Sequence, residues 1–146
     1  MMKIEKIMKS DVICVDMDDR LDTVKELFIN NKFHHLMVIN KNNELVGVIS
    51  DRDYFKATNT NIDLPSANQK DLATLNKRTH QIVTRKPVTV KEFSSYKNAI
   101  KIFHENRVSC LPVVNEKNHP VGIVTWRDIV SWLYLKTTTT KNPSPK

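Results

Sequence analysis

The chain has 146 residues, of which 40% are hydrophobic and 27% are charged, and its formal net charge is +7. This length can bury the core of one domain or of two small packed units, and the composition is ordinary for a globular protein. We find no apolar run of the roughly 18 residues that a membrane span needs, no secretion signal at the start, and too few cysteines for a disulfide framework. These features exclude a membrane-spanning or disulfide-rich protein, and we expect a cytoplasmic protein.

The net positive charge would suit a polyanionic partner such as a nucleotide, a nucleic acid or an acidic membrane. The lysines and arginines are scattered, however, and several fall in the middle of the chain and near its C-terminus. We therefore interpret the charge as a generally basic, solvated surface.

The first expected elements are a short strand and a helix. Residues 13–15 are apolar enough for a strand. Over residues 21–28 the apolar side chains then recur at helical spacing, which predicts an amphipathic helix of about three turns. Asp19 is a plausible N-cap for this helix, which should end near Asn31.

A hairpin and a second helix follow. Residues 36–39 and 46–49 are apolar runs of strand length. Asn42-Asn43 between them predicts a turn, because asparagine tolerates the left-handed conformation. A short helix begins after this hairpin, near Asp51, so the order is β-α-β-β-α.

The same order returns further along the chain. Its expected elements are a strand at residues 88–90 and a helix at 96–103, capped by Ser94. A hairpin with strands at 111–114 and 121–124 and its turn at 117–118 follows, and then a longer last helix at 126–133.

The repetition reflects an internal duplication. Gly47 begins the run Gly-Val-Ile-Ser-Asp-Arg-Asp, Gly122 begins Gly-Ile-Val-Thr-Trp-Arg-Asp 75 residues later, and the chain has only these 2 glycines. With this offset, residues 7–53 align with residues 82–128 without a gap. A unit of about 50 residues leaves one sheet face uncovered, so we expect two units to pack as a pseudo-twofold pair with a cleft between them.

We divide the chain into a first repeat at residues 1–60, a linker at 61–79, a second repeat at 80–135 and a tail at 136–146. The linker is polar, with some helix expected near Leu72 to Leu75. The tail holds four threonines in a row and two prolines. It has little to bury, so we predict that it is disordered.

Each copy of the glycine motif places a hydroxyl and a carboxylate where a strand meets a helix, as Ser50 with Asp53 and Thr125 with Asp128. A helix N-terminus offers backbone N–H groups and a positive dipole to an anion. The same spacing also fits a capping box that only starts the helix. The glycine three residues earlier marks a place where a backbone or a ligand passes close, and it favours the ligand.

These residues resemble a known family. Two β-α-β-β-α repeats, each ending in Gly-h-h-[Ser/Thr]-x-x-Asp after a strand such as Leu111-Pro112-Val113-Val114, look like a tandem pair of cystathionine-β-synthase (CBS) domains, often called a Bateman module. The resemblance covers residues 3–135. It implies an α/β (α+β) fold of two CBS repeats packed with pseudo-twofold symmetry.

The family commonly binds adenosine compounds in the cleft, including AMP, ADP, ATP, S-adenosylmethionine and sometimes NAD. The closing aspartate takes the ribose hydroxyls, the Ser or Thr helps to hold phosphate, and the first strand and the Leu-Pro-Val segment line the adenine slot. The resemblance therefore assigns to one site Ser50, Asp53, Val12, Ile13, His35 and Leu36, and to the other Thr125, Asp128, Pro87, Val88, Cys110 and Leu111. The nearby cations expected to hold phosphate are Arg127, Arg52, Lys32 and Arg107.

The first repeat departs more from the family pattern than the second. Met37 replaces the usual proline, and His34-His35 replaces a pair of small residues. The second copy carries the bulky Trp126 beside Thr125, where phosphate is expected to bind, but it is otherwise nearer the family pattern. We therefore expect the Asp128 site to be the better binder.

The resemblance implies a non-enzymatic regulatory module that requires no cofactor, binds an adenosine nucleotide and passes the ligand state to an unidentified effector protein. A homodimer through the helices is also expected, and a membrane partner is not. The alternative is a nucleic-acid-binding or purely structural interaction protein with the same fold. An enzyme is disfavoured because the sequence shows no nucleophile–base pair, no phosphate-binding loop and no metal cluster; in particular, the two adjacent histidines lack a carboxylate or thiol at ligand spacing.

Overall fold

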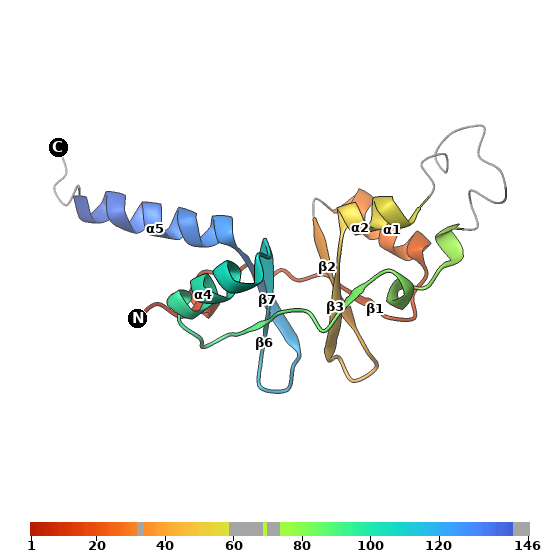
Figure 1. Cartoon of the computed structure of the whole chain (residues 1–146), viewed down its shortest axis with the longest axis horizontal. Helices are drawn as coiled ribbons and strands as arrows, with labels where there is room; N and C mark the ends of the chain where they lie inside the picture. Colours follow the sequence, from red (N-terminus) through yellow and green to blue (C-terminus); the bar gives the residue numbers. More distant parts are fainter. Residues whose placement is uncertain (32–33, 59–68, 70–73, 142–146) are drawn as a thin grey trace. The chain divides into compact units, whose positions relative to one another are not determined.

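A computed structural model of the chain describes residues 1–31, 34–58, 69 and 74–141 (Figure 1). The chain divides into two compact units. The first-repeat unit is Ile13–Pro87, and the second-repeat unit combines Met1–Val12 with Val88–Lys146. Each unit follows the predicted β-α-β-β-α order, which confirms the mixed α+β fold class.

The first-repeat unit is built on a four-stranded sheet in the order β1-β2-β3-β4. β1 pairs with β2 in parallel, and the other neighbours are antiparallel. The bounds of the elements are β1 Cys14–Asp16, α1 Leu21–Asn30, β2 His35–Ile39, β3 Leu45–Ser50, α2 Asp51–Ala57, η2 Thr74–Asn76, η3 Thr79–Gln81 and β4 Thr84–Arg85.

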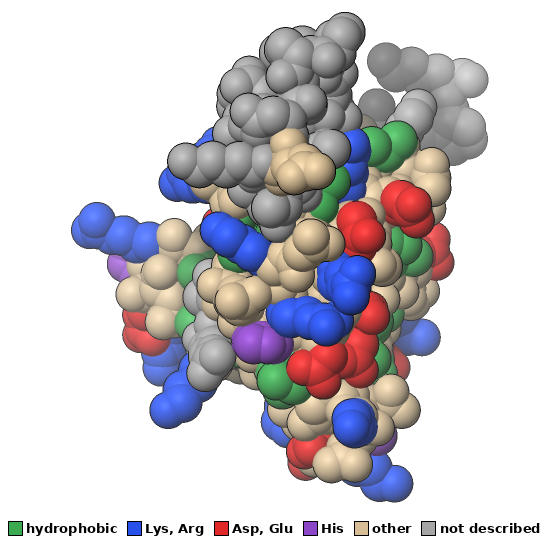
Figure 2. Space-filling model, turned by 90° about the vertical axis from the view of Figure 1, so that its right-hand side faces the viewer, with side chains coloured by type: hydrophobic (Ala, Val, Ile, Leu, Met, Phe, Trp, Pro, Cys, Tyr) green, Lys and Arg blue, Asp and Glu red, His purple; other side chains and the backbone are tan. Residues whose placement is uncertain are grey.

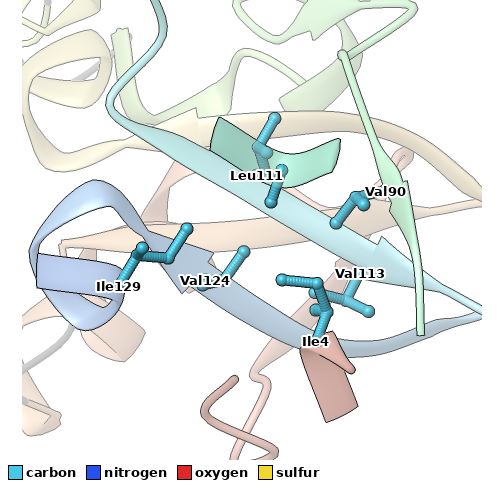
Figure 3. Close-up of a cluster of buried hydrophobic side chains, with 7 residues drawn as sticks. Ile4, Val90, Leu111, Val113, Val124 and Ile129 are labelled. Atoms are coloured by element: carbon cyan, nitrogen blue, oxygen red, sulfur yellow. The ribbon is translucent and has the colours of Figure 1, made fainter. Parts of the chain in front are cut away.

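The second-repeat unit has a three-stranded sheet in the order β5-β6-β7, with β5 and β6 parallel and β6 and β7 antiparallel. Its elements are η1 Ile4–Lys6, β5 Val90–Lys91, α4 Tyr96–Asn106, β6 Cys110–Val114, β7 Pro120–Thr125 and α5 Trp126–Lys141. Apolar residues from both helices, the sheet and η1 form its core, among them Leu111, Val124 and Ile129 (Figure 3).

The two hairpins have the predicted turns. Asn43 and Asn118 adopt positive φ angles of 61° and 64°. In each hairpin the pairing register also shifts between the last two paired residues of the first strand, Val38 and Ile39 in one and Val113 and Val114 in the other. The duplication is therefore preserved down to single backbone distortions.

The segment that leads into each repeat packs in the other repeat's unit. Ile4 is fully buried in the core of the second-repeat unit, where Figure 3 shows it beside Val113. Its N–H donates to Ser94 O at 2.8 Å, so the red N-terminal segment lies beside α4 in Figure 1. Thr79, 75 residues later, is fully buried in the first-repeat unit, and its N–H and Oγ1 both donate to Asp19 O at 2.8 Å.

Two predicted caps are wrong by one residue. The residue before α1 is Arg20, whereas Asp19 Oδ2 accepts from the Asp16 N–H at 3.0 Å and stabilises the preceding turn. The cap of α4 is Ser95, whose Oγ accepts from the Asn98 N–H at 3.3 Å.

The predicted disorder of the tail is wrong for residues 136–141, because α5 continues to Lys141. Thr137 Oγ1 donates to Leu133 O at 2.8 Å, and Thr138 Oγ1 donates to Tyr134 O at 3.0 Å. Each hydroxyl thus donates to a carbonyl oxygen one turn earlier in the same helix. Residues 142–146, together with residues 72–73 of the expected linker helix, lie outside the described part of the chain.

Candidate functional site

The Ser50–Asp53 motif lies where β3 ends and α2 begins. Ser50 Oγ accepts from the Asp53 N–H at 3.0 Å, and Asp53 Oδ2 accepts from the Ser50 N–H at 3.0 Å. The pair is thus a reciprocal capping box. Among the residues that the structure describes, the second carboxylate oxygen, Asp53 Oδ1, has no partner.

The Thr125–Asp128 motif repeats this geometry between β7 and α5. Thr125 Oγ1 accepts from the Asp128 N–H at 3.1 Å, and Asp128 Oδ2 accepts from the Thr125 N–H at 2.9 Å. All four side chains are half-buried. The cap therefore uses one oxygen of each aspartate and leaves the other to a further partner.

The first N–H of each helix is already engaged within its unit. The Asp51 N–H donates to His34 O at 3.0 Å, and the Trp126 N–H donates to Ser109 O at 3.4 Å. Because the capping boxes also use the Asp53 and Asp128 N–H groups, fewer backbone donors remain for a phosphate than the sequence indicated.

The antiparallel pairing brings one predicted site residue opposite each hydroxyl. His35 is the partner of Ser50, and Cys110 is the partner of Thr125. Both side chains are half-buried. The structure thus brings together His35, Ser50 and Asp53 at one corner, and Cys110, Thr125 and Asp128 at the other.

The His35 imidazole has a lowered pKa, chiefly because burial disfavours its charged form. The Asp51 carboxylate opposes this shift, His34 reinforces it, and Asp53 opposes it. His34 itself is exposed, and its Nδ1 lies 3.0 Å from Asp51 Oδ2. The first corner therefore holds two imidazoles and two carboxylates.

Burial raises the pKa of the Cys110 thiol to about 11. The thiol is therefore protonated at neutral pH, which suits a wall of a binding site and is unsuited to a nucleophile. Burial also raises the pKa of Cys14 on β1.

Two residues assigned to the adenine slots are not available through their side chains. Leu36 and Leu111 are fully buried in the cores of their units, on the inner strands β2 and β6. Ile13 and Val88 are partly buried and pack against the same cores. Pro87 is half-buried and is the last residue of the first-repeat unit.

The three predicted phosphate-binding cations that the structure describes belong to different elements. The Arg127 guanidinium lies over the Trp126 ring, 5.5 Å from its centroid, and both side chains are exposed. Arg52 is exposed on α2, and Arg107 is an exposed C-cap of α4 with a φ of 52°. Lys32 lies outside the described residues.

Sequence reasoning missed Lys9, whose Nζ lies 3.8 Å from Asp128 Oδ1. Lys9 exchanges two backbone hydrogen bonds of 2.9 Å with Ile123 on β7. A Cβ on Gly122 would collide with the Met8 side chain and lie 3.0 Å from Lys9 O. Gly122 is thus explained by the chain's own backbone, so it lends no support to a ligand at this place, contrary to the sequence argument. No local sequence signal points to Lys9, because its contact with Asp128 joins segments far apart in the chain.

The described residues contain no group of three or more His, Cys, Asp or Glu that could hold a metal ion. No helix in the described part of the chain combines the length and apolarity that crossing a bilayer requires.

Comparison with known proteins shows the family of this chain. The CBS domain family matches residues 4–59 and 80–135, so the chain belongs to the CBS domain family as a tandem pair. A CBS domain-containing protein of Dictyostelium discoideum is 31% identical over 133 residues, which are 89% of this chain and 90% of that protein.

Solved structures share the fold. Protein MJ1225 of Methanocaldococcus jannaschii superposes with a TM-score of 0.78 and 26% identity, over 92% of this chain and 51% of that chain. The protein CBSX2, solved in complex with AMP, superposes with a TM-score of 0.72 and 26% identity, over 92% of this chain and 98% of that chain. The second of these has nearly the same extent as this chain.

Proposed function

We propose that this protein is a non-enzymatic regulatory module that binds an adenosine nucleotide, AMP, ADP or ATP, and passes its ligand state to a partner protein. The observation that carries the proposal is the pair of half-buried aspartates whose caps each engage a single oxygen, Oδ2. A carboxylate oxygen that remains can accept from the vicinal hydroxyls of a ribose, and such charge-assisted bonds are the stronger kind. The AMP complex of CBSX2, a relative of similar extent, supports the same ligand class.

A ligand can act as a signal only if it binds one conformation of the protein better than another. The capping boxes join each aspartate to the first turn of a helix, so a ligand on Asp53 or Asp128 contacts α2 or α5 directly. We propose that this contact alters what the helices present to a partner. No bound cofactor is needed for it, and we place the protein in the cytoplasm.

The test is calorimetric titration of AMP, ADP and ATP, with S-adenosylmethionine and NAD as further candidates, into the wild type and the Asp53→Ala and Asp128→Ala variants. We expect the wild type to bind, and we expect Asp128→Ala to lose more affinity than Asp53→Ala. Asp53→Asn and Asp128→Asn are the matched controls, because an amide oxygen retains the cap while the charge is lost. Equal losses from both alanine variants would show that neither site dominates, and no binding by the wild type would refute the proposed function.

A thermal-shift panel of the same compounds gives a faster first answer. A ligand at about 100 times its dissociation constant stabilises the folded state by about 2.7 kcal/mol. Hydrolysis of ATP by the purified protein would contradict the non-enzymatic part of the proposal.

The nucleic-acid-binding alternative draws only on the net charge of +7. On the face drawn in Figure 2, blue lysine and arginine side chains are interspersed with red aspartate and glutamate side chains. A mixed surface of this kind does not concentrate positive potential along a nucleic-acid backbone. Steeply salt-dependent binding to DNA or RNA would nevertheless favour the alternative.

A further inference from the structure

The two corners differ in how their carboxylates are occupied. Asp128 Oδ2 accepts from the Thr125 N–H, and Asp128 Oδ1 faces Lys9 Nζ at 3.8 Å. The Asp128 side chain is 16% exposed and the Lys9 side chain 71% exposed. The carboxylate is therefore held in place, whereas the ammonium group is solvated and can move.

The backbone of Lys9 is held in place by β7. The Lys9 N–H and C=O exchange hydrogen bonds with Ile123, two residues before Thr125. Gly122, which has no side chain, lets Met8 and Lys9 approach this closely. The ammonium group consequently stays within reach of the corner even when it leaves Asp128.

The first-repeat corner provides an internal comparison. At the repeat offset of 75 residues, Lys9 corresponds to Thr84. Thr84 pairs with Val48 on β3 as Lys9 pairs with Ile123 on β7. Threonine carries no charge, so the Asp53 corner lacks the cation that this backbone position supplies to Asp128.

We infer that Lys9 makes the Asp128 corner selective for phosphorylated adenosine compounds over adenosine itself, an inference that rests on the proposed function. A ribose that binds Asp128 competes with the ammonium group for Oδ1. Adenosine displaces the ammonium group and offers it no anion in return. A nucleotide brings a phosphate, which the displaced ammonium group can bind through its flexible stem. The same lysine therefore opposes the neutral ligand and favours the anionic one.

The test variant is Lys9→Thr, which installs the residue of the other corner. Lys6→Gln is the matched control, because it also removes one positive charge from the leading segment and installs the counterpart at the repeat offset, Gln81. Both substitutions are made in the wild type and in an Asp53→Ala background. In that background the measured binding comes from the Asp128 corner alone. Adenosine and AMP are titrated calorimetrically at low salt, and thermal unfolding verifies that each variant is folded.

We expect Lys9→Thr to bind adenosine about two- to threefold more tightly and AMP about tenfold more weakly, as for loss of an exposed ion pair and of a charge-assisted contact. The salt dependence of AMP binding should also decrease, and Lys6→Gln should leave the ratio of the two affinities unchanged. If Lys9→Thr changed the affinities for adenosine and AMP by the same factor, or changed neither, the inference would be overturned while the proposed function survives. If neither compound binds the wild type, both are overturned.

Discussion

At the scale of single residues, the two corners share the same capping box but have different neighbouring residues. The capping boxes of Ser50 with Asp53 and of Thr125 with Asp128 agree within 0.1 Å in both bonds, at 3.0 and 3.0 Å and at 2.9 and 3.1 Å. The residue opposite the hydroxyl is His35 in one unit and Cys110 in the other. These neighbours give the corners different responses to pH.

His35 should make the protein less stable in mild acid. Its folded pKa lies below the ordinary value of 6.5, so below that value the unfolded chain binds a proton that the folded chain excludes. The free energy of unfolding should therefore fall as the pH is lowered from about 7.5 to about 5.5, and His35→Asn should weaken this dependence. Urea titrations at several pH values measure it.

The exposed His104 on α4 provides the control for this experiment, since His104→Asn removes a histidine without removing a buried imidazole. A pH dependence that is unchanged in His35→Asn would contradict the prediction. Asp51, Asp53 and His34 are the charged or titratable groups that act on His35, and they are unaltered in both variants.

Gly122→Ala should destabilise the protein by about 1–3 kcal/mol, as for overpacking of a core site. The new Cβ would meet the Met8 side chain and lie 3.0 Å from the Lys9 carbonyl oxygen. Met8→Ala in the same chain should recover only part of the loss, because the backbone contact remains. Thermal and urea unfolding measure both effects, and a stable Gly122→Ala variant would refute the close approach.

At the scale of elements, α2 and α5 present exposed apolar side chains at matched positions. Phe55 on α2 and Val130 on α5 are 66% and 52% exposed and lie 75 residues apart. Trp126 and Tyr134 are also exposed and lie four residues to either side of Val130. Apolar residues at this spacing form one stripe along a helix.

We expect the chain to form a homodimer through these helices, so Phe55→Asp or Val130→Asp should shift it toward the monomer without loss of folding. Sedimentation equilibrium measures the change. Phe93→Asp, which alters an exposed apolar residue in the loop before α4, is the control and should leave the mass unchanged. A wild-type monomer, or a dimer that tolerates both substitutions, would contradict this expectation.

At the scale of the whole molecule, the repeat in the sequence and the compact unit in space have different boundaries. Residues 4–12 begin the first repeat but pack in the second-repeat unit, and residues 80–87 begin the second repeat but pack in the first-repeat unit. Ile4 and Thr79 are equivalent under the duplication, and each is fully buried in the other repeat's unit. A chain cut between the repeats would therefore leave each core incomplete.

Ile4→Ala should cost about 2–5 kcal/mol, as for other buried large-to-small substitutions, and should destabilise the second-repeat unit. Hydrogen exchange should show reduced protection over β6, β7 and α4, and smaller changes over β2 and β3. The matched variant Thr79→Ala, which loses the 2.8 Å bond to Asp19 O, should show the opposite distribution. Loss of protection in the first-repeat unit after Ile4→Ala would contradict the exchange of segments.

The sequence by itself determined the element order, the hairpin turns at Asn43 and Asn118, and the two hydroxyl–carboxylate corners. Each depends on contacts within a few residues, such as an asparagine in the left-handed region or a capping box. Helicity beyond Lys136 was missed because the composition of the tail argued for disorder, whereas the threonine hydroxyls bond to carbonyls one turn earlier.

Only the tertiary structure decided which residues from distant parts of the chain meet at a corner. Leu36 and Leu111 are core residues because their side chains pack in the buried clusters of their units, which a strand pattern alone does not reveal. Lys9 reaches Asp128 because its backbone pairs with β7 beside Gly122. That contact joins residues 119 positions apart in the sequence, and its physical cause is packing between segments, which no local pattern encodes.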